Sequence, residues 1–190
     1  MRVRTIFTLA LFSIFCLVTF ADAQPGGRQT LSVGDSAPAL NVETWVKGEF
    51  NPSNAEVYVV EFWATWCGPC KRSIPHLTQL QEEYAEDGLT IVGISTDEDS
   101  SLVKKFVAQQ GMKMDYTIGV DNRRRTQRNW MDKAGLKGIP SAFIVDINGI
   151  IQFIGNPLEE AFEDTLHLVM SGRYDLQKSE KAQPAIDGAK

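Results

Sequence analysis

One stretch of sequence decides the fold of this chain: Val57-Tyr58-Val59-Val60-Glu61-Phe62-Trp63-Ala64-Thr65-Trp66-Cys67-Gly68-Pro69-Cys70. Its first six residues are apolar apart from Glu61, as in a strand buried at the centre of a sheet. Two cysteines three positions apart follow, at the point where a helix is expected to begin. The first turn of a helix lowers the pKa of a thiol, and the thiolate is the reactive form. The stretch therefore predicts a redox-active dithiol at a strand-to-helix junction.

The rest of the chain alternates strands with helices. Strands are expected near residues 40–45 and over 57–62, 89–95, 116–120, 141–146 and 150–154, and helices over 70–87, 100–110, 126–134 and 158–171. Asn148-Gly149, between the last two strands, is a strong hairpin signal. This order predicts an α/β fold, with a mixed central sheet covered by helices on both faces. The dithiol then lies at the carboxyl end of a central strand, where open α/β sheets place their sites.

Apolar residues at helical spacing mark the buried helix faces. They are Ile74, Leu77, Leu80 and Tyr84 in the first helix, Leu102, Val103, Phe106 and Val107 in the second, and Phe162, Leu166 and Val169 in the last. We expect Ser100 or Ser101 to cap the second helix. Trp130 and Met131 have the character of core residues, and His76 that of a surface residue.

Composition fits one globular domain that binds no nucleic acid. The chain has 190 residues and a net charge of −5, whereas nucleic-acid-binding domains usually carry a basic excess. A basic cluster, Arg123-Arg124-Arg125 with Arg128, is read as the solvated start of a helix, with a docking patch as the alternative.

The N-terminus has the pattern of a signal peptide over residues 1–23. Arg2 and Arg4 precede a charge-free apolar run over 6–20, and Ala21-Asp22-Ala23 supplies the small residues of a cleavage site. Cleavage after Ala23 would place the protein in the periplasm or another extracytoplasmic space, with no membrane span in the mature form. The alternative is a retained anchor over residues 5–21, although this run is shorter than the ~20 residues that usually span a bilayer. We further expect a flexible lead-in over 24–30, the domain over 31–174 and a disordered tail over 175–190.

The cysteine count favours redox chemistry over a metal site. Removal of the leader takes away Cys16, so the mature chain would keep only Cys67 and Cys70. A structural disulfide framework usually has more cysteines, scattered along the chain. No second Cys-x-x-Cys completes a zinc site, and His76 and His167 are far apart in sequence. We therefore expect neither a metal nor a cofactor.

Several motifs resemble one family in the expected order. Val60 to Lys71 closely resembles the active-site segment of thioredoxins, and Pro75 matches their helix-kinking proline. Gly138-Ile139-Pro140-Ser141 resembles their cis-proline segment. Val33-Gly34-Asp35-Ser36-Ala37-Pro38 resembles a redoxin-type N-terminus. An extra β-α segment over about 97–125, together with the leader, resembles the exported TlpA/ResA-type branch.

The resemblance spans roughly residues 31–171 and implies a fold and an activity. The fold is the three-layer thioredoxin-like α/β fold with an extra β-α insertion. The activity is thiol-disulfide exchange, mainly as a reductase of protein disulfides. Cys67 is then the exposed attacking thiolate and Cys70 the buried resolving thiol, and the two form the redox disulfide. The implied partners are protein disulfide substrates and an upstream electron donor, a membrane thiol-transfer protein.

Glu61 stands where thioredoxins carry a buried acid. Residues 57, 59 and 61 share one strand face, and the two valines on it argue against a solvent-facing Glu61. Burial raises a carboxyl pKa, so Glu61 could exchange a proton with Cys70 near neutral pH. The alternative is that strand alternation simply turns Glu61 into a polar pocket.

The resemblance also implies a substrate-binding surface. A cis Pro140 would hold the backbone of Ile139 opposite Cys67, where a substrate chain could pair as a short added strand. Trp66 offers a flat apolar docking surface, with Gly68 and Pro69 beside it, whereas Trp63 is read as core.

Two other functions remain open at this stage. A redoxin-type thiol peroxidase would need a Thr-x-x-Cys site, and Thr65-Trp66-Cys67 is one residue short. A non-catalytic binding or metal-delivery module is the other alternative. Many ResA-type proteins carry an acid three residues after the second cysteine, where this chain has Ser73, which weakens a specific role in cytochrome c maturation.

Overall fold

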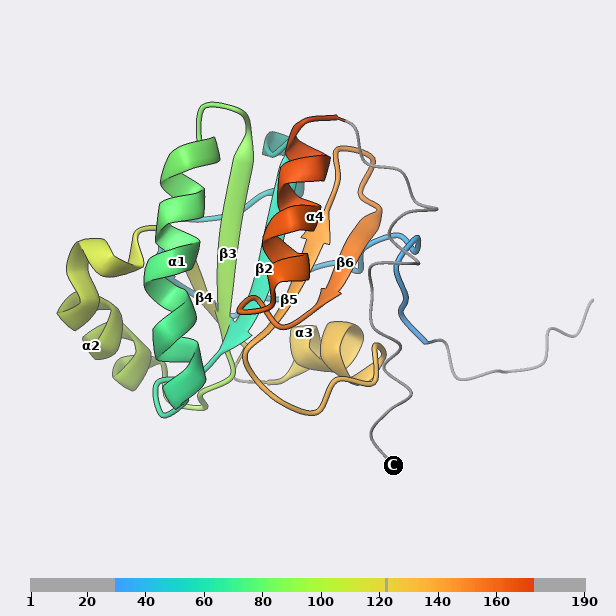
Figure 1. Cartoon of the computed structure of the whole chain (residues 1–190). Coiled ribbons are helices and arrows are strands. Elements are labelled where there is room, and N and C mark those ends of the chain that lie inside the picture. The colour runs from blue at the N-terminus through green and yellow to red at the C-terminus, as the bar shows by residue number, and fades with distance from the viewer. Residues whose placement is uncertain (1–29, 122, 173–190) are drawn as a thin grey trace, which may run out of the picture.

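A computed structural model of the protein describes residues 30–121 and 123–172. Six strands form one sheet in the order β1-β4-β3-β2-β5-β6 (Figure 1). Their bounds are Thr44–Lys47 for β1, Val57–Trp63 for β2, Leu89–Ser95 for β3, Thr117–Val120 for β4, Ser141–Val145 for β5 and Ile151–Gly155 for β6. β2, β3 and β4 are parallel, whereas β1, β5 and β6 each pair antiparallel with a neighbour. The expectation of a mixed central sheet is therefore confirmed.

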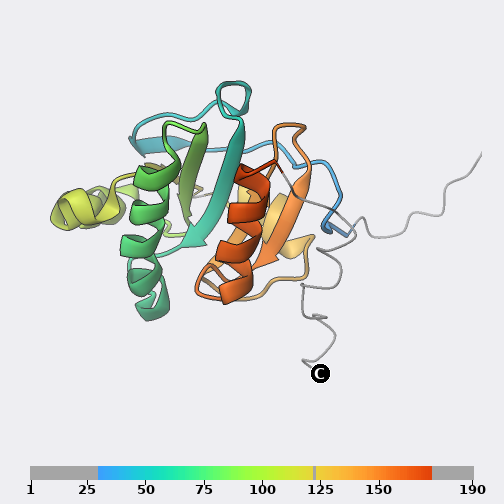
Figure 2. The ribbon, with the colours of Figure 1, turned by 45° about the horizontal axis from the view of Figure 1, so that its top comes forward.

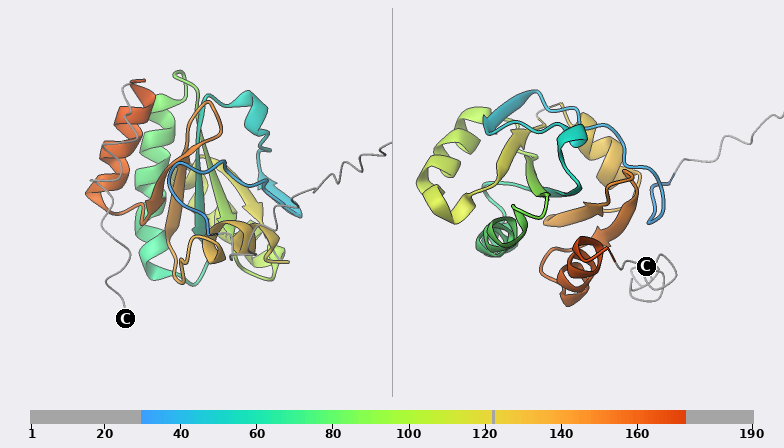
Figure 3. Two further views of the ribbon diagram at one scale, coloured as in Figure 1. Left: turned by 90° about the vertical axis from the view of Figure 1, so that its right-hand side faces the viewer. Right: turned by 90° about the horizontal axis from the view of Figure 1, so that it is seen from above.

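Helices cover both faces of this sheet. They are α1 over Gly68–Tyr84, α2 over Ser100–Gln110, α3 over Arg125–Gln127 with the π-helical turn η3 over Arg128–Asp132, and α4 over Glu160–Met170; the short 3-10 turns are η1 over Pro52–Asn54 and η2 over Gly111–Met114. α1 and α4 run side by side across one face (Figure 2). α3 and the first described residues lie on the other face (Figure 3). The predicted three layers are confirmed, and α2, η2 and β4 form the expected β-α insertion after β3.

The core has two halves, one on each face of the sheet, and β2 contributes to both. All seven residues of β2 are buried. Trp63 packs with α1 and α4 residues such as Leu77 and Leu166, while Phe62 packs on the opposite face with Trp130 and Met131. Strand alternation therefore directs Val57, Val59, Glu61 and Trp63 toward α1 and α4. Trp63, Trp130 and Met131 are core residues as predicted.

Several expectations about elements need correction. The first strand begins at Thr44, not near residue 40, because the backbone N–H of Asn41 donates to Thr126 Oγ1 at 2.8 Å and ties this segment to α3. Leu102 is 53% exposed, since the inward face of α2 is formed by Val103 and Val107, one turn apart. Asp99, rather than Ser100 or Ser101, caps α2 by accepting from Ser101 N at 2.8 Å.

Other boundaries differ less. The predicted helix over 126–134 is a single turn of α3 followed by η3, and α4 begins at Glu160 rather than at residue 158. Pro75 lies inside α1, which continues past it to Tyr84. The predicted leader over 1–23 and tail over 175–190 lie outside the described residues, as does the lead-in over 24–30 except for its last residue. Within the described ranges, no helix is both long and apolar enough to cross a bilayer.

Candidate functional site

A disulfide joins Cys67 and Cys70 at the carboxyl end of β2, where α1 begins. Cys67 is the N-cap of α1, and its Sγ accepts a hydrogen bond from the backbone N–H of Cys70 at 3.1 Å. Pro69 lies in the first helical turn, where its missing N–H costs nothing. In the reduced protein, the helix N-terminus and this N–H would stabilise a Cys67 thiolate over the thiol.

Cys67 and Cys70 are both buried in the structure, whereas the resemblance implied an exposed Cys67. Cys70 is fully buried as expected, but Cys67 is only 4% exposed in this oxidised form, so the expectation of an exposed Cys67 is wrong in degree. Its bonded sulfur lies against the backbone of Ile139. Trp66, by contrast, is 71% exposed and stands directly before Cys67 in the chain. The exposed surface next to the disulfide is therefore formed in part by the Trp66 ring.

The Ile139-Pro140 segment lies where the sequence placed it. The Ile139–Pro140 peptide bond is cis, and the carbonyl oxygen of Ile139 lies 3.7 Å from Cys67 Sγ. Ser141 Oγ donates to the carbonyl of Gly138 at 2.7 Å, which closes the turn before β5. Ile139 is partly buried and lies beside the disulfide.

Glu61 is completely buried below the dithiol. The residues in register with it are Gly93 on β3 and Ala142 on β5, and neither brings a polar side chain. Its Oε1 lies 3.4 Å from Oγ of Ser73, and Ser73 Oγ donates to the carbonyl of Cys70 at 2.9 Å. Burial raises the pKa of Glu61 to about 8, and the Ser73 hydroxyl offsets part of this rise. About one Glu61 in ten is then ionised at pH 7, so the group can take up or release a proton near neutral pH.

Sequence reasoning missed two residues that shape the site. Ser73 links Glu61 to the Cys70 carbonyl, although the sequence marked it only as a departure from the family pattern. Asp97 accepts hydrogen bonds from Thr65 N at 2.8 Å and from Thr65 Oγ1 at 2.9 Å, and so holds the segment that leads into Cys67. Its position could have been anticipated, because the carboxyl ends of the neighbouring parallel strands β2 and β3 meet at one edge of the sheet.

The two histidines, distant in sequence, are brought together away from the sulfurs. His76 Nε2 lies 3.6 Å from one Glu163 oxygen and His167 Nε2 lies 3.5 Å from the other, which joins α1 to α4. The His76 side chain is 31% exposed, so it is less of a surface residue than predicted. No group of three His, Cys, Asp or Glu residues suited to a metal ion occurs in the part of the chain that the structure describes.

Fold and site together define a thioredoxin-like protein of the thiol-disulfide oxidoreductase class. The sequence profile of the AhpC/TSA family matches residues 33–154, and the chain belongs to this family.

Known relatives agree with this class. The chain is 28% identical over 144 residues to thiol-disulfide oxidoreductase ResA of Bacillus anthracis, covering 73% of this chain and 79% of the relative. It is 30% identical over 142 residues to thiol:disulfide interchange protein HelX of Rhodobacter capsulatus, covering 72% and 75%. A solved thioredoxin family thiol:disulfide interchange protein of Chlorobium tepidum superposes with a TM-score of 0.60 at 27% identity, over 74% of this chain and 99% of that one.

Proposed function

We propose that the protein reduces disulfides in partner proteins through the Cys67–Cys70 pair. The observation that carries this proposal is the disulfide at the N-terminus of α1, with the Ile139 carbonyl 3.7 Å from Cys67 Sγ. Cys67 is slightly exposed and lies beside the Ile139 backbone, whereas Cys70 is completely buried. This arrangement suits an attacking thiol and a resolving thiol.

In the proposed cycle two electrons pass from the dithiol to the substrate. The Cys67 thiolate attacks a substrate disulfide, forms a mixed disulfide and releases one substrate thiolate, which takes up a proton. Cys70 then gives its proton to Glu61 and attacks Cys67 Sγ. This second exchange releases the other substrate thiolate and leaves the Cys67–Cys70 disulfide. An upstream dithiol donor returns the pair to the reduced form.

Glu61 is proposed as the proton acceptor for Cys70. A buried thiol attacks slowly unless a base removes its proton, and Glu61 is joined to the Cys70 turn through Ser73. A pKa of about 8 lets Glu61 change its protonation state near neutral pH, as a proton acceptor for Cys70 requires.

The substrate is proposed to bind as an extended segment along Ile139, with Pro140 fixing that backbone. Trp66, Gly68 and Pro69 are exposed beside the disulfide and provide the contact surface on the other side. We also propose that the protein is exported by residues 1–23 and receives electrons from a membrane thiol-transfer protein. Mass spectrometry of the protein purified from cells reports whether these residues are retained.

A thiol peroxidase is a weaker candidate, despite the family name. The hydroxyl of Thr65, which such a site would need near the sulfur, donates instead to Asp97 Oδ1 at 2.9 Å. Consumption of hydrogen peroxide by the reduced protein distinguishes the two activities. The proposal predicts that insulin reduction exceeds peroxide consumption, and the reverse order would favour the peroxidase.

Insulin reduction with dithiothreitol as donor tests the proposed reaction. Cys67→Ser is expected to lose activity completely, because no attacking sulfur remains. Full activity of Cys67→Ser would refute the mechanism. The direction of electron flow is tested by the reduction potential, where about −270 mV indicates a reductase and about −120 mV an oxidant.

A further inference from the structure

Three buried polar atoms on the α1 side of the sheet have no hydrogen-bond partner among the described residues. They are Glu61 Oε2, the indole Nε1 of Trp63 and the hydroxyl of Tyr116. One is an acceptor when Glu61 is ionised, and the other two are donors. A buried polar group without a partner costs about 1–3 kcal/mol, so three in one region call for an explanation.

The backbone of Gly93 brings these three groups together. Gly93 is in register with Glu61 on β2 and with Ile118 on β4. A Cβ atom at Gly93 would lie 3.0 Å from Tyr116 Cε2 and 3.1 Å from Trp63 Nε1. The Tyr116 ring and the Trp63 indole nitrogen therefore meet over the one residue of β3 that has no side chain, next to Glu61.

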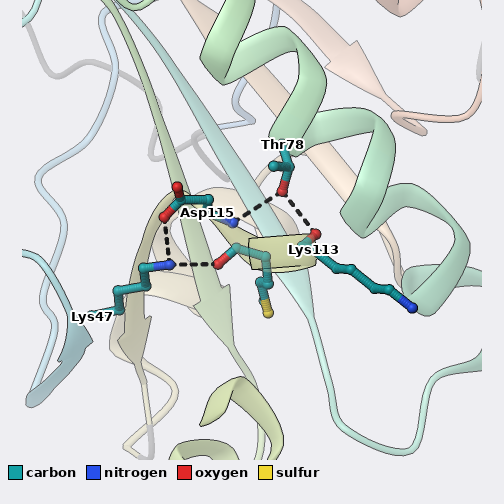
Figure 4. Close-up of polar contacts among 5 residues, drawn as sticks. Lys47, Thr78, Lys113 and Asp115 are labelled. Carbon is teal, nitrogen blue, oxygen red and sulfur yellow. Dashed lines mark hydrogen bonds and ion pairs between the residues drawn. The ribbon is translucent and has the colours of Figure 1, made fainter. Parts of the chain in front are cut away.

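Tyr116 is held in place from two sides through its neighbour Asp115. Asp115 N donates to Thr78 Oγ1 of α1 at 3.1 Å, and Lys47 Nζ of β1 donates to Asp115 Oδ1 at 2.6 Å (Figure 4). Lys47 also donates to the Met114 carbonyl at 2.9 Å. These contacts fix the start of β4, and with it the position from which Tyr116 enters the core.

Among the described residues that are in register with Glu61 or bonded to it, none is positively charged, and Lys71 of α1 lies instead over the Phe106 ring, 5.6 Å from its centroid. Cys70 and Ser73 lie on α1, Gly93 on β3 and Ala142 on β5, and Tyr116 directly precedes β4. Cys70 and Tyr116 are the titratable groups among these. Stabilisation of an ionised Glu61 must therefore come from hydrogen-bond donors rather than from an ion pair.

We propose that Tyr116 is a positioning residue for Glu61, and that its hydroxyl and the indole N–H of Trp63 donate to Glu61 Oε2 when the carboxylate is ionised, directly or through one buried water molecule. The inference rests on the proposed role of Glu61 as proton acceptor for Cys70. It adds the two hydrogen-bond donors that stabilise the ionised form of Glu61. The charge of Glu61 contributes, after burial, to raising the pKa of Tyr116 well above its ordinary value, so the phenol stays a donor.

Tyr116→Phe tests the inference, because it keeps the ring against Gly93 and removes only the donor. Titration of the Glu61 side-chain carboxyl carbon by NMR in the oxidised protein, where Cys70 does not titrate, is expected to move up by about one pH unit. The matched control is Tyr58→Phe. Tyr58 is a buried tyrosine like Tyr116, but it lies on β2 and points to the face of the sheet opposite Glu61.

Reaction of the reduced protein with Ellman's reagent separates the two chemical steps. The first thionitrobenzoate is released when Cys67 attacks, and the second when Cys70 resolves the mixed disulfide. Tyr116→Phe is expected to slow the second release about tenfold at pH 7, matching the one-unit shift, and to leave the first release unchanged. If Tyr116 had a purely structural role, Tyr116→Phe would not slow the second release selectively.

The unmodified protein provides a test that needs no variant. The indole N–H resonance of Trp63 should titrate with the same midpoint as Glu61. The N–H of Trp130, buried in the other half of the core, should not respond.

The inference is overturned if the Glu61 midpoint is unshifted in Tyr116→Phe, or if the Trp63 resonance does not titrate with Glu61. Either outcome leaves the proposed exchange through Cys67 intact. A Glu61→Gln protein whose second release keeps the unmodified pH profile overturns both the inference and the proposed role of Glu61.

Discussion

Replacing Glu61 by Gln is expected to stabilise the oxidised protein, and increasingly so as the pH rises. Burial raises the pKa of Glu61 from an ordinary 4.5 to about 8. Between these values the unfolded chain has lost a proton that the folded state retains, so the free energy of unfolding of the unmodified protein falls with rising pH. The difference of about 3.5 pH units corresponds to about 5 kcal/mol, reached above about pH 8. Glutamine has no proton to lose and escapes this penalty.

Urea unfolding followed by tryptophan fluorescence, between pH 4 and pH 9, measures this effect. The free energy of unfolding of Glu61→Gln minus that of the unmodified protein should rise by about 5 kcal/mol across the range. The matched control is Glu82→Gln, because Glu82 lies on α1 but is exposed. Its difference from the unmodified protein should stay flat. Parallel pH curves for Glu61→Gln and the unmodified protein would refute the raised pKa of the buried Glu61 on which the mechanism depends.

Two further predictions concern the surroundings of the site. Gly93→Ala should destabilise the protein by about 1–3 kcal/mol in urea unfolding, since its Cβ would lie 3.0–3.1 Å from the side chains of Ile118, Tyr116 and Trp63. Gly68→Ala, whose Cβ meets nothing within 4 Å, is the control, and an equal loss in both variants would contradict the crowding at Gly93. Asp97→Ala should cost about 1–3 kcal/mol, because Thr65 N loses its acceptor. An unchanged urea midpoint would show that Asp97 does not hold the segment before Cys67.

Elements with a strong local pattern could be predicted from the sequence. The apolar run of β2, the helix that begins at the dithiol and the turn at Asn148-Gly149 each depend on residues adjacent in the chain. β3 was predicted with the bounds that the structure has, and α2 with the same end at Gln110. The order of these elements then limited the fold to a mixed sheet with two covered faces.

The surroundings of Glu61 could not be predicted in the same way. Its burial follows from strand alternation, but the neighbours that act on it come from α1, from β3 and from the residue directly before β4. Ser73 reaches Glu61 only because α1 packs on the face of the sheet to which Glu61 points, and Tyr116 only because Gly93 leaves space on β3. Such contacts depend on strand order and register, which no local pattern encodes. Leu102 was wrongly predicted to be buried, because only a narrow face of α2, with Val103 and Val107, packs against the rest of the protein.

Trapping of the mixed disulfide tests the central claim most directly. Reduced Cys70→Ser protein is mixed with oxidised insulin, quenched with acid and digested, and its cysteine-containing peptides are identified by mass spectrometry. Exchange through Cys67 predicts a substrate peptide disulfide-bonded to Cys67, which accumulates because no resolving thiol remains, and no adduct in Cys67→Ser at the same time point. An adduct on Cys70 in Cys67→Ser that forms as fast as the Cys67 adduct would contradict the assignment of the two sulfurs.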